Sequence, residues 1–200
     1  MENPEEEHGG GGAPAPGDED VAANPCPEGG VRLNGPESLH GLFPPAFLKK
    51  LCEYKERLQG DPSSKNMLAT RYWFYDEEIA AELLSYLPPR LGLSRVVGDM
   101  RFILYPLGGY IAPHCDGVHV DKETLKSSTT SFLLYLSTIP PGEGGETEIL
   151  VSLPGQCEEP TVTHSYTPTE GSILLFPHNT PHQGNSVGSY PKFLLRGDMY

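Results

Sequence analysis

Apolar residues recur at helical intervals in two early segments of the chain. Residues 43–58 space Phe47, Leu51 and other apolar side chains three and four positions apart behind a pair of prolines, which predicts an amphipathic helix. A second segment, DEEIAAELLSYL, begins at Asp76 with acidic residues in its first turn and ends at a Pro-Pro pair. We therefore expect two helices within residues 43–88.

Beyond residue 98 the pattern changes to short runs rich in β-branched and aromatic residues, with Gly and Pro between them. Such runs are typical of strands. The predicted strands are residues 100–107, the region around His114, and residues 129–138, 147–153, 161–168, 171–177 and 192–200. Seven or eight short strands at this spacing predict a sandwich or a barrel, of which the jelly roll is one form. We therefore predict a mainly β core over residues 98–200, covered by the N-terminal helices.

Composition separates the start of the chain from the rest. Residues 1–30 contain eight acidic side chains and no Lys or Arg, and they have many Gly and Pro but almost nothing large and apolar. Such a segment cannot bury enough surface to offset the entropy lost on ordering. We predict a disordered acidic tail over residues 1–34 and a single folded domain over residues 35–200.

Charge and hydropathy argue against several classes of protein. The net charge is −13, and an acidic chain repels phosphates, so we expect no general nucleic-acid binding. We find no secretory signal and no stretch of roughly 18 apolar residues, which favours an intracellular protein, cytoplasmic or nuclear, without a membrane partner. The four cysteines show neither C-x-x-C spacing nor a disulfide framework. The oligomeric state does not follow from the sequence.

The stretch APHCDGVHV contains a candidate metal site. Side chains alternate along a strand, so His114 and Asp116 project from the same face about 6.6 Å apart along the chain, within reach of one metal ion. Because two donors do not make a site, a third must come from His164, His178 or His182. His182 begins a short predicted strand whereas His178 lies in a turn, which favours His182. By itself, the H-x-D triplet is more typical of a surface turn.

Three segments together resemble a known family. They are RFILYPLGGYIAPHCDG, SFLLYLSTIPPGEGGETEI and GSILLFPHNTPHQGNSVGSYPKFLLRGDMY. Their ordered combination, over residues 98–200, is similar to the iron(II)- and 2-oxoglutarate-dependent dioxygenases, in particular to their prolyl 4-hydroxylase-like branch. The fold that this resemblance implies is a double-stranded β-helix, a cupin-like jelly-roll core with flanking N-terminal helices.

The resemblance also implies a catalytic iron centre. His114, Asp116 and His182 match the three iron ligands of the family, and Lys192 matches the basic residue that binds the far carboxylate of 2-oxoglutarate. Two neutral imidazoles and one carboxylate on one face of iron(II) leave three positions for a bidentate keto acid and dioxygen. A structural zinc site has four protein ligands instead.

Lys192 has a competitor as the anchor of the cosubstrate. Alternation in KFLLRGDMY predicts that Lys192 and Arg196 point into the same side of the barrel, and the family spacing favours Lys192. The resemblance further implies that Tyr105 and Tyr135 place hydroxyl groups near the cosubstrate. Thr147 has a short hydroxyl that suits the same purpose, and a purely structural role is an equal alternative for it.

These implications predict an enzyme. It uses Fe(II), 2-oxoglutarate and O2, with ascorbate as an accessory reductant, and hydroxylates a C–H bond with release of succinate and CO2. The branch that the sequence resembles suggests a prolyl residue in a protein or peptide as the substrate. The alternatives are a small-molecule hydroxylase of the same chemistry and a cupin-like metal-binding protein or hydrolase that does not use 2-oxoglutarate. A hydrolase has no need for Lys192 or Arg196 inside the barrel.

Overall fold

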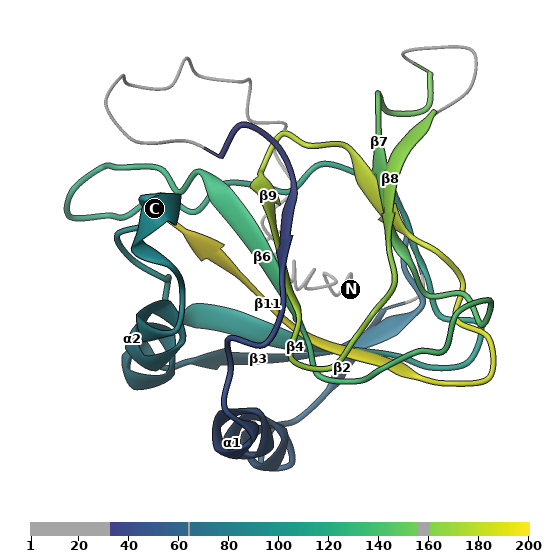
Figure 1. The fold of residues 1–200 in the computed structure, drawn as a ribbon, viewed down its shortest axis with the longest axis horizontal. Helices are drawn as coiled ribbons and strands as arrows, with labels where there is room; N and C mark the ends of the chain where they lie inside the picture. Colours follow the sequence, from purple (N-terminus) through teal and green to yellow (C-terminus); the bar gives the residue numbers. More distant parts are fainter. Residues whose placement is uncertain (1–32, 64, 156–160) are drawn as a thin grey trace, which may run out of the picture.

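Two antiparallel sheets form the body of the protein. The structure is a computed structural model that describes residues 33–63, 65–155 and 161–200. In spatial order, the larger sheet consists of β1 (Glu37–Leu39), β9 (Ile173–Pro177), β6 (Thr130–Tyr135), β11 (Lys192–Met199), β4 (Asp99–Tyr105), β3 (Ala69–Tyr75) and β2 (Asp61–Ser63). The smaller sheet consists of β5 (Ile111–His114), β10 (His182–Gly184), β7 (Thr147–Leu150) and β8 (Val162–Tyr166). The smaller sheet lies across from the larger one, and together they enclose a barrel interior (Figure 1).

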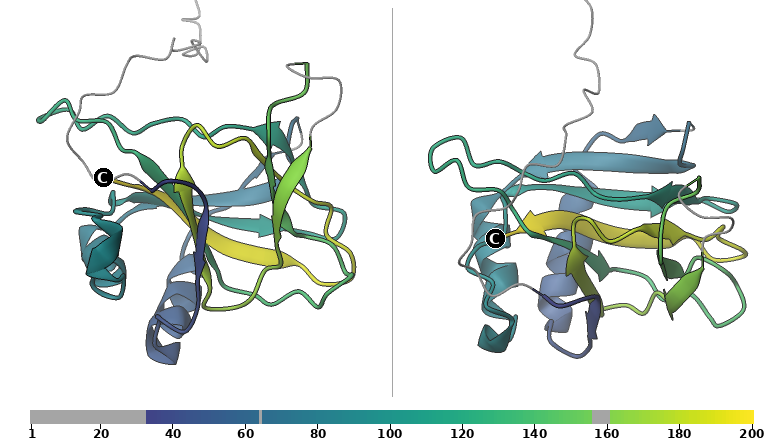
Figure 2. Two further views of the ribbon diagram at one scale, coloured as in Figure 1. Left: turned by 45° about the horizontal axis from the view of Figure 1, so that its top comes forward. Right: turned by 90° about the horizontal axis from the view of Figure 1, so that it is seen from above.

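Two helices cover one face of the larger sheet. They are α1 (Pro45–Lys55) and α2 (Glu77–Ser85), and both lie on the same side of the sheet (Figure 2). Pro45 occupies the first turn of α1, where its missing N–H costs no hydrogen bond. Asp76 caps α2, since its carboxylate accepts a hydrogen bond of 2.9 Å from the backbone N–H of Ile79. Both predicted helices are confirmed, and of the helices that the structure describes none is long and apolar enough to cross a membrane.

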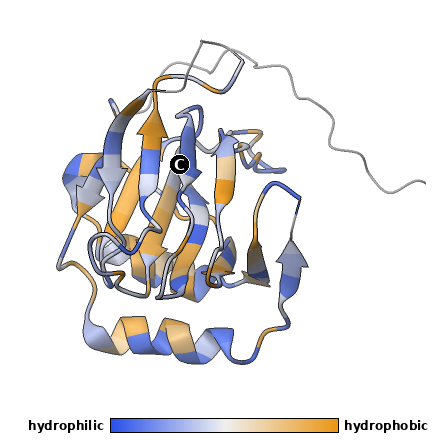
Figure 3. Ribbon diagram, turned by 90° about the vertical axis from the view of Figure 1, so that its right-hand side faces the viewer, coloured by the Kyte–Doolittle hydropathy of each residue, from blue (hydrophilic) through white to orange (hydrophobic). Residues whose placement is uncertain are grey.

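Both faces of the larger sheet are buried, one under the helices and one in the barrel interior, and successive side chains of a strand point to opposite faces. On β11, Leu195 packs under the helices together with Phe47 of α1 and Leu83 of α2, whereas Leu194 faces the barrel interior. All six residues of β6 are buried for the same reason. Hydrophobic and polar positions alternate along other strands and along the helices (Figure 3). The outer face therefore supplies most of the hydrophobic core, and the inner face is free to carry polar groups between apolar ones.

The predicted mainly β core with flanking helices is confirmed, with one correction. Residues 43–88 are not entirely helical, because β2 and β3 lie between the two helices. Trp73 and its aromatic neighbours belong to β3. The run ATRYWFY pairs along its length with β4, where β-branched and aromatic side chains fit a pleated surface. The predicted tail lies almost wholly outside the described residues, so it stays a prediction.

Replacing Asp76 with Ala removes the N-cap of α2. We expect the free energy of unfolding to fall by about 0.5–2 kcal/mol, because the N–H of Ile79 loses its partner at the helix start. Urea unfolding monitored by circular dichroism measures the change. Asp61→Ala serves as the matched control, because Asp61 is exposed and is expected to alter stability by less than about 0.5 kcal/mol. Equal effects of the two substitutions would contradict the assignment.

Candidate functional site

Strand pairing brings the three predicted metal ligands together. β10 pairs with β5 so that His182 lies directly opposite His114, and the two imidazole ring centres are 4.2 Å apart. Asp116 follows two residues after the end of β5. Its Oδ1 is 3.7 Å from His114 Nε2, and its Oδ2 is 4.0 Å from His182 Nε2. One donor atom from each residue lies within 4.8 Å of the other two.

The route by which Asp116 reaches the cluster differs from the one that alternation predicts. Asp116 lies outside β5, so a shared strand face does not orient it. Its backbone N–H donates instead to the carbonyl oxygen of His178, at 3.0 Å, which ties the loop after β5 to the turn before β10. This contact turns the carboxylate back toward the two imidazoles.

Each of these imidazoles is held by its other nitrogen. His114 Nδ1 lies 2.9 Å from the carbonyl oxygen of Ala112, and His182 Nδ1 lies 3.0 Å from that of Thr180. Because a carbonyl oxygen only accepts, each Nδ1 carries the proton, and each Nε2 presents a lone pair toward Asp116. This tautomer is the one that binds metals through Nε2, with the second nitrogen fixing the orientation of the ring.

Electrostatics favour the protonation states that a cation requires. Burial opposes ionisation of Asp116, yet the pKa of this carboxyl lies well below its ordinary value, and the charge of Arg196 contributes to the lowering. Burial lowers the pKa of His182 to about 4, against the opposing charge of Asp116. At neutral pH the cluster therefore holds a carboxylate and a neutral His182.

The donor set fits a divalent cation. Asp116 Oδ2 is buried and has no hydrogen-bond partner among the described residues, a state that costs free energy unless another group satisfies it. Oδ1 of the same carboxylate lies 3.2 Å from Arg196 Nη2. A cation held by two imidazoles and this carboxylate has the ligand set of a two-histidine, one-carboxylate facial triad, which suits iron(II). Within the described part of the chain, no fourth His, Cys, Asp or Glu joins this group.

His178 lies in a separate network behind the cluster. Both of its ring nitrogens contact serine hydroxyls, Nδ1 with Ser131 at 2.7 Å and Nε2 with Ser128 at 2.8 Å. Its Nδ1 is also 3.9 Å from Asp198 Oδ1. The structure thus places His182, and not His178, beside His114 and Asp116. His178 supports the site through its backbone contact with Asp116.

Lys192 lies deep in the barrel, and the described residues provide no carboxylate partner for it. Its side chain is buried, and Nζ is 3.1 Å from Thr147 Oγ1, which also accepts a 2.8 Å hydrogen bond from the hydroxyl of Tyr135. Nζ lies 5.4 Å from the ring centre of Tyr105 and 5.6 Å from that of Tyr135. Burial lowers the pKa of Lys192 to about 7. Among the described carboxylates, none is within ion-pair distance of this amine.

Arg196 points into the same interior, but its charge is already paired. Nη2 lies 3.2 Å from Asp116 Oδ1, and Nη1 lies 3.0 Å from both oxygens of Asp198. The predicted shared orientation of Lys192 and Arg196 agrees with the structure, since both line one cavity. Of the two cations, Lys192 is the one left for the carboxylate of a bound molecule.

The metal cluster and Lys192 line one cavity of about 830 Å³. Its volume lies in the range of small-molecule and cofactor sites. Gly184, on β10, forms part of the wall near Lys192. A Cβ atom at this position would lie 2.9 Å from Ile111 Cγ2 and 3.7 Å from Lys192 Nζ, so the wall approaches closely only because residue 184 lacks a side chain.

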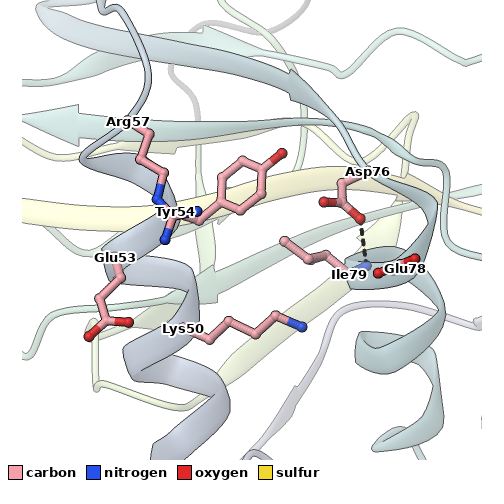
Figure 4. Close-up of a pocket in the computed structure, with 7 residues that line it drawn as sticks. All are labelled: Lys50, Glu53, Tyr54, Arg57, Asp76, Glu78 and Ile79. Carbon is pink, nitrogen blue, oxygen red and sulfur yellow. Dashed lines mark hydrogen bonds between the residues drawn. The ribbon is translucent and has the colours of Figure 1, made fainter.

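A smaller cavity of about 250 Å³ lies between α1 and α2, on the far side of the larger sheet (Figure 4). Two of the charged groups at this cavity are engaged in other contacts of the helices. Asp76 caps α2, and Lys50 Nζ lies 2.7 Å from Glu82 Oε2. This hollow is separate from the metal cluster and contains none of its residues.

Comparisons with known proteins identify the family. Residues 100–197 match the family model of the 2OG-Fe(II) oxygenase superfamily. This match covers 98 residues, just under half of the chain, and assigns that segment to the superfamily. The matched segment includes His114, Asp116 and His182 together with Lys192. A search of curated protein sequences found no significant match.

Solved structures of similar fold include proteins with different molecules bound. A Pseudomonas putida prolyl-4-hydroxylase aligns with a TM-score of 0.61 at 19% identity, over 82% of this chain and 91% of that one. A Trichoplax adhaerens prolyl hydroxylase in complex with a peptide fragment of the hypoxia inducible factor oxygen degradation domain aligns at 0.57 and 16%, over 84% of each chain. HygX from Streptomyces hygroscopicus, with nickel, 2-oxoglutarate and hygromycin B bound, aligns at 0.56 and 14%, over 82% of each chain. These likenesses confirm the oxygenase jelly-roll fold.

Sequence reasoning missed two arginines in the cavity. Arg71 and Arg101 line it together with the metal cluster. Arg101 could have been found, because it shares a strand face with Tyr105, two alternations along β4. Arg71 could not, because no strand was predicted over β3.

Removing the imidazole of His182 tests the metal cluster. We expect His182→Ala to weaken Fe(II) or Mn(II) binding by more than the roughly 10–100-fold that follows loss of a supporting contact, because a ligand atom disappears. His178→Ala is the matched comparison and should weaken metal binding less, because alanine keeps the backbone carbonyl that contacts Asp116. Equilibrium dialysis of the anaerobic protein measures both. A larger loss for His178→Ala would transfer the ligand role to His178.

Proposed function

We propose that this chain is an iron(II)- and 2-oxoglutarate-dependent dioxygenase that hydroxylates a C–H bond of its substrate and releases succinate and CO2. One observation carries the proposal. The His114, Asp116 and His182 cluster lies in the same cavity as a buried lysine that has no carboxylate partner in the described chain. The oxygenase chemistry uses a metal at one end of a dicarboxylate and a cation at the other.

In this proposal, the residues of this chain bind and orient the metal and 2-oxoglutarate. His114, His182 and Asp116 hold the metal on one side. Lys192 and Thr147 receive the far carboxylate of 2-oxoglutarate. When bound, iron(II) with 2-oxoglutarate and dioxygen supplies the oxidising chemistry that converts C–H into C–OH. Burial of Lys192 and of the Asp116 carboxylate inside the barrel keeps their charges strongly coupled to a bound molecule.

Charge compensation supports the same assignment. The +2 charge of the metal and the +1 charge of protonated Lys192 balance Asp116 and the two carboxylates of the keto acid. Tyr135 contributes a hydrogen bond that orients the Thr147 hydroxyl, and the ring of Tyr105 forms a wall beside the amine. A metal hydrolase would use the three ligands but would leave buried Lys192 without a role.

For the substrate we propose a prolyl residue in a protein or peptide. The support is the family together with the prolyl hydroxylases among the structures of similar fold. A small molecule is the second candidate, because HygX has the same fold and was solved with hygromycin B bound.

Anaerobic loading with Fe(II) and 2-oxoglutarate tests the oxygenase. We expect a visible charge-transfer band, and succinate after admission of O2 with ascorbate as the reductant. Asp116→Ala should abolish both signals because it removes a metal ligand. Absence of the band and of succinate from the wild-type protein, with metal shown to be bound, would refute the proposal.

Lys192 makes cosubstrate binding depend on pH. Its pKa is about 7 because of burial, so the amine is mostly neutral at pH 8 in the protein without 2-oxoglutarate. The bound dianion favours the ammonium form, so binding at pH 8 should take up close to one proton. Affinity should weaken by up to about tenfold per pH unit above 7. Calorimetry in buffers of different ionisation enthalpy measures the uptake.

Lys192→Arg provides the comparison for this linkage. A guanidinium stays protonated throughout the range, so this uptake should disappear. If wild type and Lys192→Arg take up equal numbers of protons, Lys192 is not the anchor.

A further inference from the structure

Two arginines in the cavity have no part in the proposed chemistry. Arg71 lies on β3 and Arg101 on β4, and both line the cavity that holds the metal cluster. Arg71 is paired with Ile103, two residues beyond Arg101 on the same face of β4. Diagonal neighbours of this kind have Cα atoms about 7–8 Å apart, so one small anion can contact both guanidinium groups.

Among the described residues, neither arginine has a carboxylate within ion-pair distance, although Asp61 lies opposite Arg71 in the pairing of β2 with β3. Nε of Arg71 and Nε of Arg101 are buried without a hydrogen-bond acceptor, and neither side chain forms an ion pair with a described carboxylate. Other arginines of this acidic chain do form ion pairs, as Arg95 does with Glu77 and Asp121. Half-buried guanidinium groups that the described part of an acidic chain leaves without a carboxylate favour an anionic ligand at this end of the cavity.

The whole cavity carries excess positive charge. Its lining has five cations and one carboxylate among the described residues, namely Lys65, Arg71, Arg101, Lys192, Arg196 and Asp116. Asp198 lies behind Arg196 and neutralises one more charge, which leaves +3. Iron(II) and the 2-oxoglutarate dianion cancel each other, so the excess remains after both are bound.

Strand pairing concentrates this excess positive charge around Arg101. Arg101 lies directly opposite Arg196 across β4 and β11, and like charges in directly opposite positions destabilise a sheet. Burial and then the charge of Arg196 lower the pKa of Arg101 to about 10, so it stays charged at neutral pH. On its other side the Arg101 guanidinium lies 4.6 Å from the ring centre of Trp73, which holds it in place by a cation–π contact.

We infer that Arg71 and Arg101 form a subsite for a carboxylate group of the primary substrate. The inference rests on the proposed function, because it assigns the substrate end of that same cavity. Planar guanidinium groups bind a carboxylate through paired N–H donors, which gives both affinity and orientation. The substrate class is thus a molecule with a carboxylate near the C–H bond that reacts, either an acidic peptide or a free carboxylic acid.

Trp73 provides a direct reporter for this subsite. It is the only tryptophan of the chain, and its ring stacks on Arg101. The full-length protein, loaded anaerobically with Mn(II) and 2-oxoglutarate, is titrated with two matched pairs of probes. One pair is a proline-containing hexapeptide with Asp beside the proline and the same peptide with Asn. The other pair is L-proline and L-prolinamide.

We expect the carboxylate probe of at least one pair to change Trp73 fluorescence at concentrations about tenfold or more below its amide counterpart. The pair that responds tells whether the carboxylate belongs to a peptide or to a free acid. Equal responses within both pairs, or none, would overturn the inference.

Variants assign the preference to the two arginines. Arg71→Gln and Arg101→Gln should remove the preference for the responding carboxylate, measured by calorimetry, while Arg101→Lys keeps part of it. Arg57→Gln, outside the cavity, should leave it unchanged. Affinity for 2-oxoglutarate should stay the same in both Gln variants. If that affinity falls while the probe preference persists, the arginines serve the cosubstrate and the inference is wrong.

Succinate formation separates this inference from the proposed function. If the protein forms no succinate but binds the carboxylate probe at Trp73, the subsite inference stands and the oxygenase proposal is refuted. If the protein forms succinate in air but prefers neither carboxylate probe, the oxygenase proposal stands and the subsite inference is refuted.

Discussion

The site depends on the pairing register between β5 and β10. Because His182 is directly opposite His114, two imidazoles share one side of a narrow pair of strands, and Asp116 needs only a short loop to join them. A shift of one residue would turn His182 away from the barrel, since successive side chains of a strand point to opposite faces. β7 holds the same three residues of β10 from the other side, which stabilises this register.

The two sheets contribute different kinds of polar groups to the barrel interior. The smaller sheet and its loops provide the metal ligands, whereas the cations Lys192, Arg196 and Arg101 come from β11 and β4 of the larger sheet. Arg196 joins the two sets by its contact with Asp116. Burying these charges costs free energy unless they compensate one another. The two sheets must therefore pack together for the charges of the site to be buried.

Much of this arrangement could be predicted from the sequence, and the rest required the order of the strands. Helix caps such as Asp76 act locally, and the motif around His114 resembles a known family over a long segment, so both were accessible. Pairing across strands is not local. The sequence alone did not predict β3, and without it the cation–π contact of Trp73 with Arg101 and the place of Arg71 could not be foreseen.

Position 184 shows how an absent side chain can set a chemical property. The wall beside the Lys192 amine is bare backbone, and a single methyl group there would meet Ile111 and narrow that end of the chamber. The absence of a Cβ atom at residue 184 therefore leaves room for a bound molecule beside the amine. A larger residue at this position would reduce the space beside Lys192 without changing the charge of the cavity.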